Sequence, residues 1–218
     1  MNKKEIQKRR MMHYFIDAAY KIIEEDGIES VTIRKVSDLA GYNSATLYNY
    51  FENIDHLIFL SAMRYIKDYT VSLSKYIKDA NNALEKFLCI WECFCKYSFE
   101  KPEIYHAIFF AKLDKNLEDY VSQYYDLFPE DLGSSSEDLS AMLLKHNIYD
   151  RGMTILEECA KENFINEEDA SAINEITLLI YEGILLRVIR KKITSEEAVM
   201  KTIKYIKKVV ISYTIKDI

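Results

Sequence analysis

The 218-residue chain is 49% hydrophobic and contains only 5 Gly and 2 Pro, which excludes wholesale disorder and disfavours a turn-rich β fold. Its net charge of −6 gives no overall sign of a nucleic-acid binder. The charge is uneven, however. Residues 1–10 hold five basic side chains and one acidic one, a net charge of +4, so the other 208 residues carry −10. A basic terminus on an acidic body suits a small contact with DNA as well as it suits a solvated tail.

No apolar stretch approaches the roughly 20 residues that span a bilayer, and no apolar signal-peptide core follows the basic start. We therefore expect a cytoplasmic protein with no membrane contact. The four cysteines (Cys89, Cys93, Cys95, Cys159) show no disulfide-framework spacing. No phosphate-binding glycine loop, nucleophile elbow or zinc-protease motif is present, so we expect neither an enzyme nor a bound cofactor or metal.

The first part of the chain predicts one long helix and two short ones, each with a clear end. Apolar residues recur at helical spacing over 5–26, and Gly27 ends that helix. Thr32 is a good N-cap for a helix that Gly41 ends. Asn43 is a second N-cap, for a short helix from Ser44 to about Tyr50. Two short helices joined at a glycine predict a helix-turn-helix, in which Val36, Ala40 and Leu47 pack between the helices.

The rest of the chain is predicted to be helical. A long helix is expected from Asn53 or Asp55 to about 79, followed by helices over 82–99, 103–126, 138–163, 167–192 and 196–214. Thr194 and Glu197 form a capping box for the last one. The segment 128–136 is loop-like, and we expect it to be mobile.

The predicted helix-turn-helix resembles the DNA-binding domain of TetR-family regulators. The resemblance covers about residues 9–58 and rests on Thr32-Ile33-Arg34, Ala40-Gly41, Thr46-Leu47-Tyr48, Tyr50-Phe51 and Leu57. Three positions depart from the family pattern: Tyr42, Ala45 and Ile54, the last of which replaces a lysine that commonly faces a phosphate. The resemblance implies an all-α fold, with a three-helix DNA-binding domain over 1–52 and a larger helical bundle for effector binding and dimerisation over 53–218.

Double-stranded DNA is thus the expected partner, and the candidate contacts divide by chemistry. Hydroxyl groups suit phosphate contacts, and polar or small side chains suit base edges. The hydroxyl-bearing candidates are Thr32, Thr46, Tyr48 and Tyr50. The base-edge candidates are Arg34, Lys35, Tyr42, Asn43, Ser44, Ala45 and Asn49. The basic side chains of the first ten residues (Lys3, Lys4, Lys8, Arg9, Arg10) would release counterions, and an A·T-rich target is a hypothesis.

Two half-sites on one duplex require a homodimer. The two C-terminal helices are the expected interface, as the resemblance also implies. The candidate interface residues are Ile176, Ile180, Ile184, Ile203, Ile206 and Val210. A monomeric bundle is the alternative.

The family implies a small-molecule effector pocket, and the aromatic-rich region from Trp91 to Tyr125 is its expected place. The candidate lining residues are Trp91, Phe94, Tyr105, Phe109 and Tyr124. We therefore predict a ligand-responsive repressor. An adaptor that is tethered to DNA and binds a protein partner is the alternative. Cys89, Cys93 and Cys95 lie close together on one predicted helix, and Cys89 and Cys93 share a face. A thiol or metal sensor is therefore a second hypothesis for the same region, beside plain hydrophobic packing.

Overall fold

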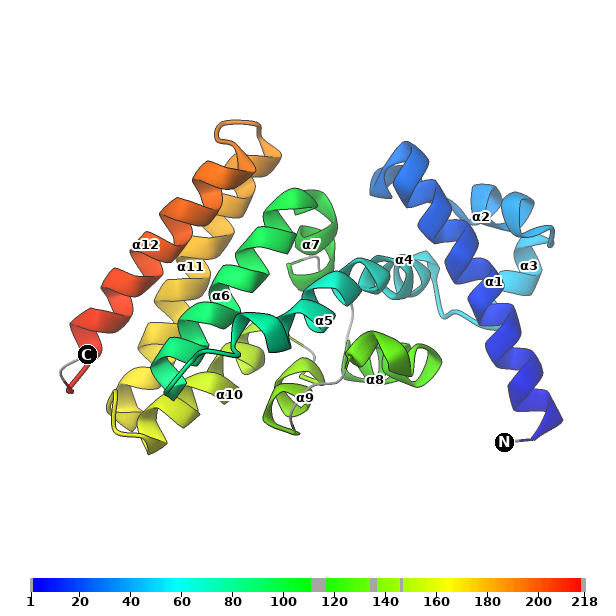
Figure 1. The fold of residues 1–218 in the computed structure, drawn as a ribbon. Helices are drawn as coiled ribbons and strands as arrows, with labels where there is room; N and C mark the ends of the chain where they lie inside the picture. Colours follow the sequence, from blue (N-terminus) through cyan, green and yellow to red (C-terminus); the bar gives the residue numbers. More distant parts are fainter. Residues whose placement is uncertain (1, 111–116, 134–136, 146, 217–218) are drawn as a thin grey trace.

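The computed structural model describes residues 2–110, 117–133, 137–145 and 147–216, and the described chain is helical without strands. The helices form two groups along an elongated molecule (Figure 1). Helices α1 to α3 lie at one end, and α11 and α12 lie at the other. Within the described residues, no helix combines the length and the apolar character that a membrane crossing needs.

The N-terminal group contains α1 (Lys3–Asp26), the 3-10 turn η1 (Ile28–Ser30), α2 (Ile33–Ala40) and α3 (Ser44–Leu47). The predicted caps are confirmed: the Thr32 side chain accepts from the backbone N–H of Lys35, and the Asn43 side chain accepts from that of Ala45. Gly41 has a φ of 76° in the left-handed region, as its place at the turn predicts. The third helix is shorter than expected, because residues 48–50 form turns instead of continuing the helix.

The connection to the rest of the protein is α4 (Ile54–Ala62), the 3-10 turn η2 (Met63–Ile66) and α5 (Lys67–Tyr76). The sequence predicted one unbroken helix here, and that prediction is wrong in detail. The buried Ser61 hydroxyl donates back to the carbonyl of Leu57 at 2.7 Å just before the 3-10 turn. Such a bond competes with the helical ladder and bends helices.

The described residues of the C-terminal body form nine more helical segments, of which two are 3-10 turns. In chain order they are α6 (Ala83–Glu100), α7 (Pro102–Phe109), α8 (Leu117–Leu127), η3 (Pro129–Leu132), α9 (Glu137–Leu143), α10 (Ile148–Lys161), η4 (Glu167–Asp169), α11 (Ala170–Ile189) and α12 (Ser195–Tyr213). The capping box of Thr194 and Glu197 is confirmed. The segment 128–136, predicted to be a loop, contains the 3-10 turn η3. Residues 134–136 of that segment lie outside the described residues.

Two predicted helices are split in the structure. The helix expected over 103–126 ends at Phe109, and residues 111–116 lie outside the described chain. The helix expected over 138–163 is two helices, because Asn147 caps a new one by accepting from the backbone N–H of Asp150 at 2.7 Å.

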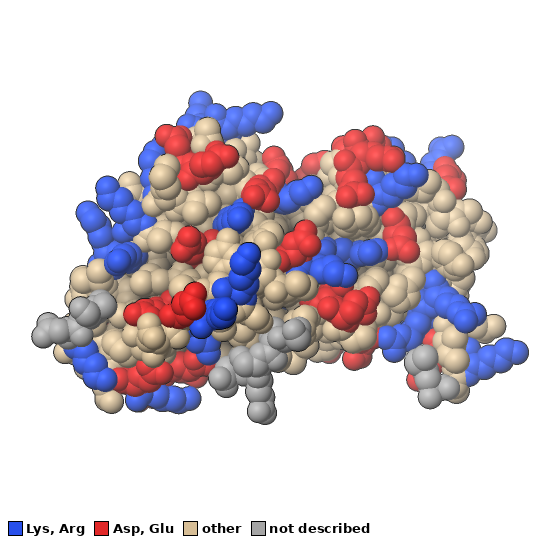
Figure 2. All heavy atoms as spheres, viewed as in Figure 1, with Lys and Arg blue, Asp and Glu red and all other residues tan. Residues whose placement is uncertain are grey.

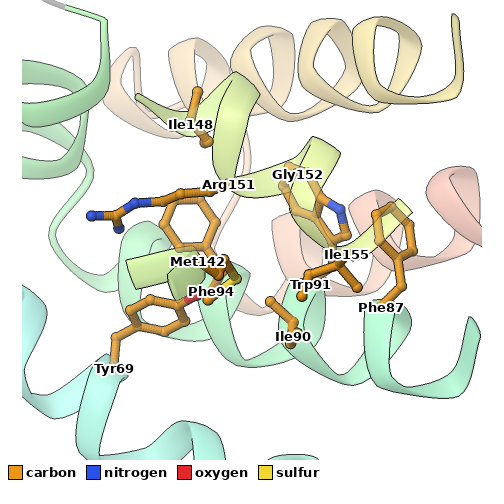
Figure 3. A pocket seen from close by; sticks show the side chains of 10 residues that line it. All are labelled: Tyr69, Phe87, Ile90, Trp91, Phe94, Met142, Ile148, Arg151, Gly152 and Ile155. Carbon is orange, nitrogen blue, oxygen red and sulfur yellow. The ribbon is translucent and has the colours of Figure 1, made fainter. Parts of the chain in front are cut away.

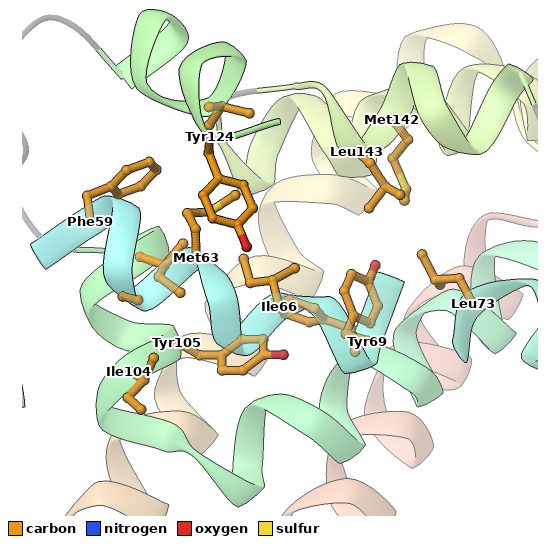
Figure 4. Packing of buried hydrophobic residues seen from close by; sticks show 14 of the residues in the cluster. Phe59, Met63, Ile66, Tyr69, Leu73, Ile104, Tyr105, Tyr124, Met142 and Leu143 are labelled. Atoms are coloured by element: carbon orange, nitrogen blue, oxygen red, sulfur yellow. The ribbon is translucent and has the colours of Figure 1, made fainter. Parts of the chain in front are cut away.

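The linker helices cross the centre of the molecule and are packed on both sides (Figure 4). Tyr124 of α8 and Leu143 of α9 lie on one side of the linker, and Tyr105 of α7 lies on the other. Met63 and Leu73 of the linker are fully buried. The linker is therefore one route by which a movement in the C-terminal body can reach the N-terminal helices.

Candidate DNA-binding surface and ligand pocket

Helix α3 is held from behind by a small apolar core. Val36 of α2 and Leu47 of α3 are both fully buried, and Phe51 packs edge-on against Phe15 of α1 at a ring-centroid distance of 6.0 Å. Ala40 is half-buried beside them. A helix of four residues has no stability of its own. It packs mainly on α2 through the buried Leu47, and its outer face is left to solvent.

The predicted DNA-contacting side chains lie mostly on this outer face. Tyr48 is 55% exposed, and the other exposed members are Thr32, Arg34, Lys35, Tyr42, Asn43, Ser44, Ala45 and Asn49. Thr46 and Tyr50 are half-buried. The Tyr50 ring lies 6.1 Å from that of Phe15, so its ring is braced by the core.

Several of these residues already have partners within the protein. The Asn43 side-chain oxygen accepts from the backbone N–H of Ala45 at 2.6 Å as a helix cap, which occupies one of the two lone pairs of that oxygen. Lys35 lies 3.2 Å from Asp26, and Arg34 lies 3.8 Å from Asp38, both on the surface. Exposed pairs of this kind are weak and do not prevent a phosphate contact.

The basic terminus is part of the first helix, which starts slightly before the predicted residue 5. Helix α1 begins at Lys3 with a capping box in which Asn2 and Glu5 bond each other's backbone. Figure 2 shows Lys and Arg side chains gathered at the end of the molecule where α1 begins. Lys4 and Lys8 line a groove with Asn49 and Tyr50. The basic turns of α1 are therefore continuous with the surface that α3 presents.

A set of polar and aromatic contacts joins α1 to the linker and to α8. The Arg9 guanidinium donates to the carbonyl of Asp126, and Arg64 pairs with Asp17. The Arg64 guanidinium also lies over the rings of Tyr20 and Phe128, at 4.9 Å and 5.2 Å. Sequence reasoning did not find this junction, since its members are far apart in the chain and carry no local pattern.

A narrow cavity of about 40 Å³ lies in the C-terminal body between α5, α6, α9 and α10. Trp91 and Phe94, both predicted pocket residues, line it (Figure 3). Tyr69, Met142 and Arg151 also line it. Because about 10–15 Å³ of such space holds one water, the side chains that line the cavity leave room for only a few water molecules in this conformation.

The other three predicted pocket residues stand elsewhere. Phe109 and Tyr105 contact Phe94 from behind, at ring-centroid distances of 5.4 Å and 5.7 Å. The hydroxyl of Tyr124 donates to the buried Asp131 at 2.6 Å. Tyr124 does not line the cavity, and α8 packs on the linker, so Tyr124 is a core residue of the domain junction.

The cysteines are free and mostly buried, in keeping with plain packing. Burial raises the pKa of the Cys93 and Cys159 thiols to about 12 and also raises the pKa of Cys89. Thiols are the unreactive form. Among the residues that the structure describes, no group of three or more metal-ligating side chains comes together.

Helices α11 and α12 present apolar residues to solvent at the end of the molecule remote from α3 (Figure 1). Leu179 is 63% exposed and Met200 is 66% exposed. Ile176, Ile180 and Ile203 are half-buried. The remaining predicted interface residues, Ile184, Ile206 and Val210, are buried in the core of this same chain and so are not available to a partner.

The braced helix pair, its exposed polar face and the adjoining basic turn define a helix-turn-helix protein with a larger helical body. Residues 15–59 match the family model for bacterial regulatory proteins of the tetR family. The match covers the second half of α1, both short helices and the start of the linker.

Solved structures share the fold of the whole chain. A protein from Syntrophomonas wolfei, assigned as a TetR-family transcriptional regulator, is 17% identical, with a TM-score of 0.61 over 95% of this chain and 98% of that one. A Mesorhizobium loti protein of the same assignment is 12% identical, with a TM-score of 0.59 over 99% of this chain and 100% of that one. The fatty acid degradation regulator FadR from Bacillus halodurans is 14% identical, with a TM-score of 0.55 over 90% and 94%. No curated protein matches the chain in sequence. The protein thus has the fold of TetR-family transcriptional regulators.

Proposed function

We propose that the protein is a repressor that binds operator DNA as a homodimer and leaves it when a small-molecule effector binds. The observation that carries this proposal is the four-residue helix α3, braced by a buried Leu47 while Tyr48 and Asn49 stay exposed. Folding alone does not require exposed hydroxyl and amide groups there, whereas a duplex groove does. No catalytic role is proposed.

On DNA, α3 would enter the major groove and the hydroxyls around it would set the register. Thr32, Thr46, Tyr48 and Tyr50 would donate to phosphates. Asn49 and Ala45 would meet base edges, and the basic first turns of α1 would supply the salt-dependent part of the affinity. The same assignment divides the chain at about residue 52 into a DNA-binding domain (1–52), called the reader, and a C-terminal body (53–218).

The dimer would form through α11 and α12. Burying Leu179 and Met200 against a second copy would remove about 25 cal/mol of unfavourable hydration per Å² of apolar surface. A two-fold axis there would place the two copies of α3 on one face of the duplex, about 34–36 Å apart.

The effector would act through the linker. It would enter the cavity beside Tyr69 on α5 and spread α10 from α6. Since α5 continues into α4, and α4 packs on α1, the two readers would move relative to each other and lose the two-site fit. An adaptor that binds a protein partner through the same body is the second candidate, favoured only by the exposed Leu179 and Met200.

The proposal is tested by selecting bound fragments from genomic DNA with the purified protein. The selected sites should be inverted repeats with half-sites about one helical turn apart. The affinity of the protein for such a fragment is then measured with and without each candidate effector. A bound effector must weaken DNA binding, and DNA must weaken effector binding by the same factor. Tight effector binding that leaves the DNA affinity unchanged would remove the proposed mechanism, and a failure to select any sequence would remove the DNA-binding proposal.

A further inference from the structure

One charged side chain lies in the wall of the cavity with its charge unmatched. Arg151 of α10 is only 6% exposed and lines the cavity. Its Nε donates to the carbonyl of Lys145 at 3.0 Å, and its Nη2 donates to that of Leu143 at 2.9 Å. Its Nη1 is buried without a hydrogen bond of normal geometry, and the group beside the guanidinium is the buried, neutral hydroxyl of Tyr125 on α8. In the described part of the chain, no carboxylate forms an ion pair with this guanidinium.

A structural role accounts for only part of this arrangement. The carbonyl of Leu143 ends α9, and arginine donors commonly satisfy such terminal carbonyls. The ring of Phe109, 5.2 Å from the guanidinium carbon, adds a cation–π contact. Neither interaction supplies a negative charge, and a guanidinium stays protonated when buried. Buried charges are ordinarily paired, so Nη1 is an unfilled position for an anion.

The rest of the cavity is apolar. Figure 3 shows the Arg151 side chain reaching from α10 toward the end of the cavity where Tyr69 lies, while Trp91 and Phe87 lie at the other end. Met142 and Ile155 complete the walls between them. A ligand that fits this lining has one anionic end and a hydrocarbon or aromatic body.

We propose that the cavity binds a small hydrophobic carboxylate, with its carboxylate on Arg151 and its apolar body against Trp91 and Phe87. This inference rests on the proposed function, because it names the chemical class of the effector. A single negative charge matches one arginine, whereas a dianionic phosphate would bring a second charge into apolar surroundings without a partner. Because the cavity is too small for such a ligand, side chains must move to admit it, and the flexible Met142 is suited to do so.

Trp91 is the only tryptophan in the chain, so its fluorescence reports directly on this cavity. The probes are 3-phenylpropanoate and octanoate, each compared with its primary amide, 3-phenylpropanamide and octanamide. Each pair has nearly the same shape but differs in charge at neutral pH. We expect the acids to change Trp91 emission saturably, with Kd values about 10- to 100-fold lower than those of the amides. A Trp91→Phe variant gives the background signal.

The same titrations on Arg151→Gln and Arg151→Lys assign the effect to this residue. In Arg151→Gln the ratio of acid to amide affinity should fall to about one, and Arg151→Lys should keep only part of it, because lysine lacks the paired donors. Arg64→Gln, which removes an arginine at the domain junction, should keep the wild-type ratio. If Arg151→Gln does not fold, the acid-to-amide affinity ratios of the wild type and of Arg151→Lys still show whether Arg151 binds the carboxylate.

The outcomes separate this inference from the proposed function. Acids and amides that bind equally and both release DNA would overturn the role of Arg151 while the repressor mechanism stands. If no probe changes Trp91 emission, the carboxylate inference is overturned. The repressor mechanism would then still be tested by measuring DNA release with other effectors. Acid preference that survives in both Arg151 variants would also count against the assignment.

Discussion

The imidazole of His56 lies flat on the ring of Tyr120, with centroids 4.0 Å apart and planes within 3°. His56 is in the first turn of α4 and Tyr120 is in α8, so this stack joins the linker to the body. The Nδ1 of His56 accepts from the backbone N–H of Glu52 at 3.3 Å, and its Nε2 lies 2.7 Å from the Gln123 side-chain oxygen. The Tyr120 hydroxyl donates to the Glu52 carboxylate at 2.8 Å. The arrangement requires a neutral imidazole with its proton on Nε2.

The His56 environment predicts a loss of stability in mild acid. Burial lowers the pKa of His56, more than its bond to Gln123 and the nearby Glu52 charge raise it. As the pH falls below the unfolded value of about 6.5, the unfolded chain takes up a proton that the folded chain resists, so folding becomes less favourable. The melting temperature should therefore drop between about pH 8 and about pH 5.5. The drop should be smaller in His56→Asn, even though that variant is less stable overall, and an equal drop in both proteins would contradict this role.

Loss of the Tyr48 hydroxyl should weaken DNA binding without affecting the fold. The side chain is 55% exposed and supports nothing in the core. A hydrogen bond from a neutral donor to a phosphate contributes about 1.5–3 kcal/mol, so Tyr48→Phe should raise Kd at least about tenfold. Fluorescence anisotropy with a selected operator fragment measures the change. Tyr149→Phe, on the C-terminal body, is the matched control and should bind as the wild type does. An unchanged Kd for Tyr48→Phe would place DNA contact elsewhere.

The close approach of α10 to α11 depends on the absence of a side chain at Gly152. A Cβ there would lie 2.1 Å from Oδ1 of Asn174, which is fully buried and donates through its amide to the Tyr149 carbonyl at 2.8 Å. Gly152→Ala should therefore destabilise the protein by about 1–3 kcal/mol, the usual cost of overpacking. Urea unfolding measures it.

A double-mutant cycle tests the cause of that loss. In an Asn174→Ala background the added methyl group has room, so Gly152→Ala should cost clearly less than in the wild type. Equal costs in the two backgrounds would show that the clash with Asn174 is not the reason.

An acidic residue at position 179 should keep the chain monomeric. We expect wild-type protein to elute as a species of twice 25.7 kDa in size-exclusion chromatography with light scattering. Leu179→Asp should shift it toward 25.7 kDa, because an unpaired charge would be buried at the proposed interface. Val71→Asp changes an equally apolar side chain, 54% exposed on α5, and should leave the dimer intact. A monomeric wild type at micromolar concentration would contradict the dimer itself.

The sequence by itself determined where several helices begin and how the helix-turn-helix turns. The caps at Thr32, Asn43 and Thr194 and the left-handed turn at Gly41 depend on interactions within four residues, so the sequence alone predicts them. The burial of Leu47 and the exposure of Tyr48 also followed from the pattern, since a very short helix has only one side to pack.

Only the tertiary structure decided which apolar side chains face which neighbour. Ile206 and Val210 have the same helical periodicity as interface residues but are buried in their own chain, while Leu179 and Met200 are the ones left exposed. Arg151 also lines the cavity, although the sequence did not indicate it and predicted α9 and α10 as one helix. Tyr124, a predicted cavity residue, lies at the domain junction instead. Periodicity shows that a helix has an apolar face, but the partner of that face depends on contacts between segments far apart in the chain.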